Sequence, residues 1–238
     1  FRPQTLIEVS DALTHAREHL TTEMALRIIT SLTEGYGADG ALTNLVEQRE
    51  IWVLPALNPD GAVYDVASGF PGQWRKNRRP NGDGSFGVDL NRNFGYRWGC
   101  CNGSSGSPWN DEYRGPAAFS EPETGVIRDF ALAHPDLRAT LSLHSFSELV
   151  LWPYGYTRDE LPADMDATDY AALAAIGRGM AGLNGYTPMQ SSRLYITDGD
   201  SDDWLYGELG IFAFTIEVYP RYNPPGFYPP ASVIDRET

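Results

Sequence analysis

The stretch His15-Ala16-Arg17-Glu18 places an imidazole and a carboxylate three positions apart. One turn of backbone can direct two such side chains toward a single cation, and both are ligands that zinc accepts in proteins. The same spacing is frequent on ordinary surface helices, so by itself it indicates a metal site only weakly. A metal centre here would need a further ligand from elsewhere in the chain.

Two other residues could complete such a centre. His144 directly follows the apolar stretch Leu141-Ser142-Leu143, although a histidine at a strand end is more often a hydrogen-bonded core residue. Glu217 lies in the apolar run 211–218, where an ionised carboxylate is costly unless it has a partner or a function. Catalytic zinc typically has three protein ligands, and a separate carboxylate acts as base toward a water molecule. The chain contains that set of groups, but composition alone leaves it one possibility among several.

The elements that must position these residues alternate between strands and helices, which indicates an α/β domain. Apolar patterns predict strands at 5–9, 50–57, 137–143, 150–152 and 211–218, a turn at 58–61, and helices at 21–33, 121–134 and 169–183. The second of these helices should begin after Ser120, with Glu123 completing a capping box. Residues 65–118 and 219–238 are expected to be largely irregular. His144 and Glu217 thus stand at strand ends, where open α/β sheets place their sites.

The composition excludes some classes of function. The 238 residues carry a net charge of −14, which argues against a nucleic-acid partner because phosphate binding needs clustered Lys and Arg. The longest basic cluster, residues 74–79, is too short for such a face and better suits a small anion site. No apolar run approaches the roughly 20 residues of a membrane span.

The two cysteines, Cys100 and Cys101, are adjacent. Two cysteines cannot form a disulfide framework, and no histidine stands near them to suggest a metal site. We expect two free thiols in a Gly- and Ser-rich loop. A vicinal disulfide and pairing with another chain remain alternatives.

Six motifs, in this order, resemble the zinc carboxypeptidases of the pancreatic carboxypeptidase A/B type, and in particular their secreted bacterial relatives of the carboxypeptidase T kind. They are His15-Ala16-Arg17-Glu18; Trp74-Arg75-Lys76-Asn77-Arg78; Val88-Asp89-Leu90-Asn91-Arg92-Asn93; Leu143-His144-Ser145 with Pro153-Tyr154-Gly155-Tyr156; Leu194-Tyr195 with Asp203-Trp204; and Phe214-Thr215-Ile216-Glu217. The resemblance implies one α/β domain over residues 1–238, with a mixed, mostly parallel central sheet flanked by helices.

The resemblance also implies which residues would carry the chemistry. His15, Glu18 and His144 would bind one zinc ion. Asp89 would accept a hydrogen bond from a ligand imidazole and fix its orientation. Glu217 would be the general base toward water and would later protonate the leaving amine.

Five further residues would act on the substrate if the resemblance holds. Arg78 would stabilise the oxyanion of the tetrahedral intermediate. Asn91 and Arg92 would bind the terminal carboxylate, Tyr195 would close over the terminal residue, and Arg17 would contact substrate further from the cleaved bond. Taken singly, each could equally be a surface ion pair or a loop residue; their order in the chain favours the catalytic interpretation.

Specificity depends on the residue seven positions after the substrate tyrosine, which in the family lies at the floor of the side-chain pocket. Here it is Asp202, and a buried acid favours a cationic side chain. Bacterial relatives with an acid there also accept apolar residues, so we expect basic or mixed basic and apolar specificity. Asp198, Asp200 and Asp202 do not fit an EF-hand loop, although another kind of structural Ca²⁺ site is possible.

Fewer residues precede His15 and follow Glu217 than in the family, so we expect a domain that lacks N- and C-terminal parts. We expect a secreted, monomeric metallocarboxypeptidase that acts on the C-termini of peptides or proteins, with no nucleic-acid or membrane partner. One alternative is a zinc-dependent deacylase of N-acyl amino acids on the same fold, which would generally lack Asn91, Arg92 and Tyr195. The other is an inactive, truncated binding domain, which would usually have lost a ligand or the base.

Overall fold

The central element is a six-stranded sheet in a computed structural model that describes residues 6–9, 12–67 and 72–237. The strands are β1 (Leu6–Val9), β2 (Glu50–Val53), β3 (Leu137–Ser145), β4 (Leu149–Trp152), β5 (Thr187–Gln190) and β6 (Phe212–Val218), in the order β2-β1-β3-β6-β4-β5. Four neighbouring pairs are parallel, and β4 runs antiparallel to β6. The expected mixed, mostly parallel sheet is confirmed.

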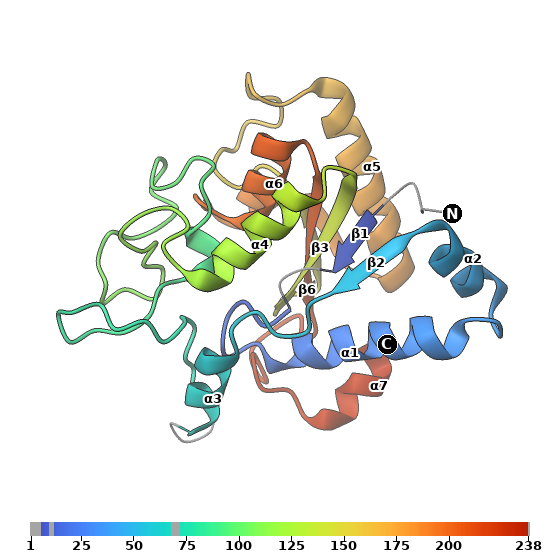
Figure 1. Ribbon diagram of the computed structural model, residues 1–238, viewed down its shortest axis with the longest axis horizontal. Helices are drawn as coiled ribbons and strands as arrows, with labels where there is room; N and C mark the ends of the chain where they lie inside the picture. The colour runs from blue at the N-terminus through green and yellow to red at the C-terminus, as the bar shows by residue number, and fades with distance from the viewer. Residues whose placement is uncertain (1–5, 10–11, 68–71, 238) are drawn as a thin grey trace.

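Helices cover the sheet on both faces (Figure 1). They are α1 (His19–Gly35), α2 (Gly40–Gln48), α3 (Pro59–Ala67), α4 (Pro122–Ala133), α5 (Ala167–Asn184), α6 (Ser201–Leu209) and α7 (Ile234–Glu237), with short 3₁₀ turns η1 (Leu90–Arg92), η2 (Ser191–Arg193) and η3 (Ala231–Val233). Among the residues that the structure describes, no helix combines the length and the apolar character needed to cross a lipid bilayer.

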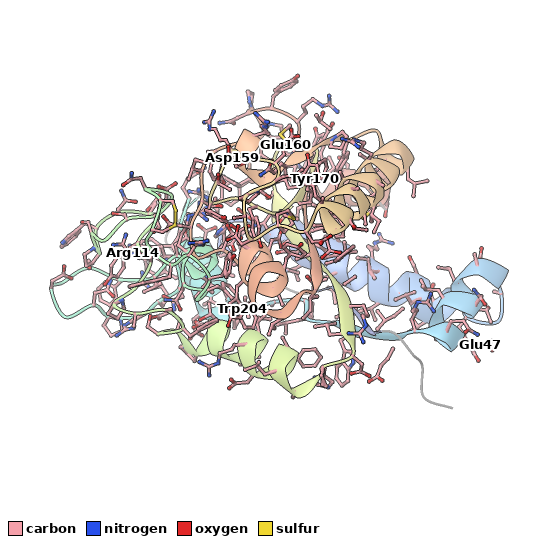
Figure 2. The ribbon with its side chains drawn as sticks, turned by 90° about the horizontal axis from the view of Figure 1, so that it is seen from above. Glu47, Arg114, Asp159, Glu160, Tyr170 and Trp204 are labelled. Carbon is pink, nitrogen blue, oxygen red and sulfur yellow. A yellow bond between two sulfur atoms is a disulfide. The ribbon has the colours of Figure 1, made fainter. Side chains whose placement is uncertain are left out.

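The two faces of the sheet have different partners because successive side chains of a strand point to opposite sides. On one face, Leu141 and Leu143 of β3 and Ile216 of β6 pack in clusters that include residues of α1 and α5. On the other, Ala213 packs with residues of α4 and α6, among them Trp204 (Figure 2). By the same alternation, His144 and Glu217 emerge on the α6 side.

Several elements differ from the sequence-based expectations. The predicted turn at 58–61 instead opens α3, since Pro59 fits a first helical position where its missing N–H costs nothing. Helix α1 begins at His19, two residues before the expected start. Helix α4 is preceded by Glu121 rather than by Ser120, and no side-chain cap is made there. Helices α2 and α6 and strand β5 have no counterpart in the prediction.

The segment between α3 and α4 projects from one end of the sheet (Figure 1) and agrees with the expected long loop. Its described part contains only η1 and two isolated bridges, Pro80 with Phe86 and Ser105 with Tyr113. The S–S bond between Cys100 and Cys101 lies in this region, on the same side of the molecule as Arg114 (Figure 2). The expectation of two free thiols is therefore wrong, and the vicinal disulfide is the alternative that holds.

Candidate metal centre and active site

Three buried side chains converge at the C-terminal end of β3. The Nδ1 atom of His15 lies 2.8 Å from Oε1 of Glu18, and Nδ1 of His144 lies 3.0 Å from Oε2 of the same carboxylate. The two Nδ1 atoms are 3.2 Å apart. Each of the three residues is at most 4% exposed. Among the described residues, they form the one group of three or more potential metal ligands.

The backbone around His15 explains this convergence. Residues 12–18 form an irregular turn that begins at Leu13, whose φ is +62°, and Glu18 then occupies the N-cap position of α1. The turn is fixed from outside, because Asn58 donates to the carbonyl of Thr14 and Ala16 donates to the carbonyl of Arg75. His15 and Glu18 therefore meet across a single backbone turn, which the 3.0 Å hydrogen bond from the N–H of Glu18 to the carbonyl of His15 closes just before α1 begins.

The charges in this cluster suit a cation. Burial, and then the nearby Arg75 guanidinium, lower the pKa of His15, so its imidazole remains neutral and free to act as a ligand. Burial opposes ionisation of Glu18, but His15 and His144 outweigh it and hold the pKa of that carboxyl well below its usual range. Metal ligation requires this combination of neutral imidazole and ionised carboxylate.

The residues present fit a zinc ion. Two imidazole Nδ1 atoms and a carboxylate face one point at 2.8 to 3.2 Å from one another, which is an unfavourable meeting of lone pairs unless a proton or a cation lies between them. Two His and one Glu is an established ligand set for catalytic zinc, and it leaves a fourth position open.

Asp89 supports the centre from the side opposite Glu18. Its Oδ1 atom lies 3.3 Å from Nε2 of His15, and its Oδ2 atom accepts hydrogen bonds of 2.9 Å from Nε and Nη2 of Arg75. Burial would raise the pKa of this fully buried carboxyl, but Arg75 and Arg92 outweigh it and keep that pKa far below its usual range. An ionised carboxylate here fixes the ring of His15 with Nδ1 directed to the cluster, as expected for a group that orients a ligand.

Arg75, rather than Arg78, is the arginine of the Trp74–Arg79 segment that reaches this centre. Arg75 is buried, and its Nη1 atom lies 3.4 Å from Nδ1 of His15. The Arg78 guanidinium instead lies over three aromatic rings, 3.5 Å from the centroid of Tyr64, 4.6 Å from Phe86 and 4.8 Å from Trp74. The structure thus does not bring Arg78 to the metal ligands, contrary to the expected role.

Glu217 stands beside the ligands on the neighbouring strand. In the parallel β3–β6 ladder, Glu217 is the Cα partner of His144. Burial, together with the negative charge of Glu18, raises the pKa of Glu217 to about 8 even though His144 and Arg75 act in the opposite direction. A carboxyl whose pKa lies near neutrality is suited to accept and return a proton.

One pocket joins these groups to the predicted substrate residues. Its lining includes His15, His144, Glu217, Asn91, Arg92, Tyr195 and Asp202. The Asn91 Oδ1 atom accepts from the backbone N–H of Ser201, so the NH₂ group is the part of that side chain open to a carboxylate. The structure therefore brings seven residues from separate segments of the chain together around one pocket.

Comparison with known proteins agrees with this arrangement. The sequence profile of a family described as zinc carboxypeptidase matches residues 7–238. The chain belongs to the zinc carboxypeptidase family. It is 46% identical over 228 residues to a zinc carboxypeptidase of Saccharothrix mutabilis subsp. capreolus, covering 94% of this chain and 52% of that protein. It is 37% identical to carboxypeptidase A2 of Rattus norvegicus, covering 94% of this chain and 53% of that protein.

Solved structures of the zinc carboxypeptidase family have the same fold. The crystal structure of thrombin activatable fibrinolysis inhibitor superposes with a TM-score of 0.87 at 31% identity, covering 100% of this chain and 59% of that one. Carboxypeptidase A from Helicoverpa armigera gives a TM-score of 0.83 at 30% identity, covering 99% and 57%. The chain spans about half the length of the curated relatives that it matches.

Arg17 lies outside the pocket lining. Its Nη1 atom donates to the carbonyl of Gln73 at 3.2 Å, and its guanidinium lies 4.2 Å from the ring centroid of Phe227. Phe227 in turn packs edge-on against Phe146, next to the strand that carries His144. Arg17 thus stands beside the site rather than in it, which is compatible with contact to a more distant part of a substrate.

The three aspartates considered for a structural calcium ion, which all lie in the described part of the chain, do not support such a site. Asp198 accepts from three backbone N–H groups, and Asp200 accepts from the N–H of Asp203 and the hydroxyl of Thr197. Asp202 accepts from the hydroxyl of Thr215 at 2.8 Å. These carboxylates hold protein donors where a calcium ion would need their oxygens.

Three residues at or beside the site were not predicted from the sequence to act there. Arg75 could not be distinguished by sequence from the neighbouring cations of its motif. In the structure, its pairing with the buried Asp89 distinguishes it. Asp200 also lines the pocket, and Asp198 holds the loop that carries the disulfide. Asp198 and Asp200 lie just before α6, a helix that was not predicted because the sequence at 198–203 is rich in Asp.

Proposed function

We propose that this chain forms the catalytic part of a zinc-dependent metallocarboxypeptidase, which hydrolyses the last peptide bond of peptides or proteins. The observation that carries the proposal is the single pocket shared by two metal ligands, Glu217 and the Asn91–Arg92 pair. A site that needs a free carboxylate beside a hydrolytic centre can reach only the end of a chain.

Each residue has a defined task in this proposal. His15, Glu18 and His144 hold the zinc ion, which when bound supplies Lewis-acid polarisation of a carbonyl and activation of water. Glu217 accepts a proton from the attacking water and delivers it to the leaving amine, a use that fits its raised pKa.

The substrate presents a terminal carboxylate and develops an oxyanion during the reaction, and different cationic residues stabilise these two negative groups. Arg92 binds the terminal carboxylate, with Asn91 as a second donor. We assign stabilisation of the developing oxyanion to Arg75 instead of Arg78, because Arg75 stands at the ligand cluster. Tyr195, which is 45% exposed, covers the terminal residue from the solvent side.

The pocket composition supports a basic or mixed specificity. Asp202 is 4% exposed and lines the pocket, so an ammonium or guanidinium group reaching it would gain a charge partner in a poorly hydrated place. Leu151 and Leu194 line the same pocket and offer contact to apolar side chains. We therefore expect cleavage of C-terminal Lys and Arg, together with some apolar residues.

The biological setting is proposed from relatives alone. Carboxypeptidase A2 of Rattus norvegicus and carboxypeptidase B of Bos taurus are among the relatives, and on that basis we propose a secreted, monomeric enzyme with peptide or protein C-termini as partners. One related structure is a complex of bovine thrombin-activatable fibrinolysis inhibitor with tick carboxypeptidase inhibitor, so we propose a protein inhibitor of this kind as a further partner.

A direct assay tests the function. Peptides ending in Lys, Arg, Phe or Leu are incubated with the zinc-loaded protein, with and without a chelator, and the products are read by mass. Loss of one C-terminal residue, blocked by chelator and by Glu217→Gln, is the expected result. Cleavage of N-acyl amino acids alone would instead indicate a deacylase, and no cleavage of either class would indicate a binding domain.

A further inference from the structure

The carboxylate of Asp198 organises the loop that contains the disulfide. Asp198 is fully buried and lies three residues before α6. Its oxygens accept hydrogen bonds from the backbone N–H groups of Gly99 at 3.2 Å, Cys101 at 2.9 Å and Gly103 at 2.9 Å, and from the hydroxyl of Ser104. One side chain thus collects four donors from a loop about a hundred positions away.

The same loop contacts the arginine proposed to bind the substrate carboxylate. The carbonyl oxygen of Gly103 accepts a hydrogen bond of 2.8 Å from Nε of Arg92. Gly103 is therefore bound through its N–H to Asp198 and through its C=O to Arg92. Since Nη1 of Arg92 donates to the Asn91 carbonyl at 2.6 Å, the guanidinium is held on two sides and Nη2 is left for the pocket.

The backbone at Gly103 is packed closely against a neighbouring segment of the chain. A Cβ atom at this position would lie 2.2 Å from the carbonyl carbon of Thr197, so the loop backbone presses directly on the segment before α6. That segment also forms a wall of the pocket, since Thr197, Asp200 and Asp202 line it. The disulfide between Cys100 and Cys101 ties together two residues of the loop, and Cys101 itself donates to Asp198.

We propose that Asp198 is a positioning residue for carboxylate recognition, and that the Cys100–Cys101 bridge strengthens its hold. Through Gly103, Asp198 sets the direction of the Arg92 guanidinium and so the affinity for a free C-terminus. This inference rests on the proposed carboxypeptidase activity and adds to it a residue that does not touch the substrate. A buried carboxylate with four donors rigidifies a loop more than a neutral acceptor could, because hydrogen bonds to charged groups are the stronger ones.

The test uses the zinc-loaded protein and two variants. Asp198→Asn keeps the shape but removes the charge and half of the acceptor capacity, and the double variant Cys100→Ser/Cys101→Ser removes the bridge. We expect KM to rise about tenfold in Asp198→Asn, with kcat within about twofold of the parent. KM should also rise in the double serine variant, but only about threefold.

A second measurement does not depend on turnover. Binding of N-acetyl-phenylalanine and of its amide is followed by NMR titration, and the ratio of the two dissociation constants reports recognition of the carboxylate. This ratio should shrink in Asp198→Asn. The amide protons of Gly99, Cys101 and Gly103 should also exchange faster, because their acceptor has been weakened.

A matched control separates positioning from stability. Asp166 is exposed and accepts two backbone N–H groups as the N-cap of α5, well outside the pocket lining. Asp166→Asn should lower the melting temperature and leave KM and the binding ratio unchanged.

A KM for Asp198→Asn within twofold of the parent, in a protein that cleaves peptides, would overturn the role of Asp198. An unchanged KM in the double serine variant would overturn the role of the bridge. A parent protein without peptidase activity would refute the proposed function instead, while the binding ratio would still test Asp198.

Discussion

His144 and Glu217 are direct partners in the parallel ladder between β3 and β6, so one ligand and the proposed base are set by a single strand register. Their side chains emerge on the same face because both belong to the alternate set that faces α6. A slip of one residue in β6 would turn Glu217 to the opposite face, toward the cluster that contains α1. The two groups therefore cannot be repositioned independently of the sheet.

Glu217→Gln should abolish most of the peptidase activity and spare the metal. Removal of a general base typically costs about 10²- to 10⁴-fold in rate, while the three ligands remain in place. Steady-state kinetics and zinc content by atomic absorption measure the two effects. Glu208→Gln, an exposed change on α6, is the control and should alter neither. Loss of zinc in Glu217→Gln would contradict the assignment as base.

His144→Ala and His15→Ala should each lower zinc content and thermal stability. The ligand cluster is buried, so removing one imidazole also leaves Glu18 without one of the two neighbours that keep it ionised. Zinc content after dialysis and melting temperature with and without chelator are the measurements. In His134→Ala, at the end of α4, zinc content should match the parent. Parental zinc content in both ligand variants would refute the site.

Arg75→Ala and Arg78→Ala should differ sharply. Loss of a transition-state donor lowers kcat/KM by about 10²- to 10³-fold, which we expect for Arg75. Arg78 stacks on Tyr64 and Phe86, so its loss should lower stability by about 0.5 to 1 kcal/mol for each such contact and leave kcat/KM within a few-fold. Arg75→Lys, which keeps the charge without the forked geometry, controls for loss of the Asp89 ion pair. Equal kinetic effects at the two positions would refute the distinction.

Glu217 should contribute less to the stability of the metal-free protein as the pH rises from about 5 to 8. The pKa of Glu217 is raised from 4.5 to about 8 in the folded chain. Between these values the folded state binds a proton that the unfolded state has lost, so unfolding is favoured as pH increases. Melting temperatures across this range should fall less steeply in Glu217→Gln than in the parent. Parallel pH profiles for the two proteins would contradict the raised pKa.

Asp202→Asn should shift the substrate preference. The change removes the negative charge from the pocket and keeps its shape, so kcat/KM for peptides ending in Lys or Arg should fall about tenfold relative to those ending in Phe or Leu, for about 1.4 kcal/mol of lost interaction. Competition between such peptides, read by mass, measures the ratio. Asp159→Asn, a change at an exposed residue outside the pocket lining, should leave it unchanged. An unaltered ratio in Asp202→Asn would place the determinant elsewhere.

The site residues were predicted most accurately where a family motif coincides with the end of a strand. His144 follows an apolar strand, and Glu217 interrupts another, so their common edge of the sheet could be inferred before any coordinates. The spacing of His15 and Glu18 predicted a single turn of backbone, and the structure has such a turn just before α1. The residues were identified from local pattern, but the way they meet depends on distant groups such as Asn58.

Other features could not be predicted because tertiary contacts decide them. Which arginine of residues 74–79 turns inward depends on the pairing of Arg75 with Asp89, 14 positions away. The acidic run at 198–203 predicted no helix and left only a structural Ca²⁺ site other than an EF-hand open, and Asp is a poor residue for helix interiors. It forms the start of α6 because Asp200 caps the helix and accepts from the N–H of Asp203. The state of Cys100 and Cys101 likewise depended on backbone geometry.

The zinc site also joins two parts of the chain that are far apart in sequence. Glu18 and His144 are separated by 126 positions, so an ion held by both would act as a cross-link that closes a very long loop. In the chain-entropy account, closing a loop of this size disfavours the unfolded state by about 4 to 5 kcal/mol. A proteolytic nick in the projecting segment between α3 and α4 would fall inside that loop. The two fragments would then stay tethered to each other for as long as the ion remained bound.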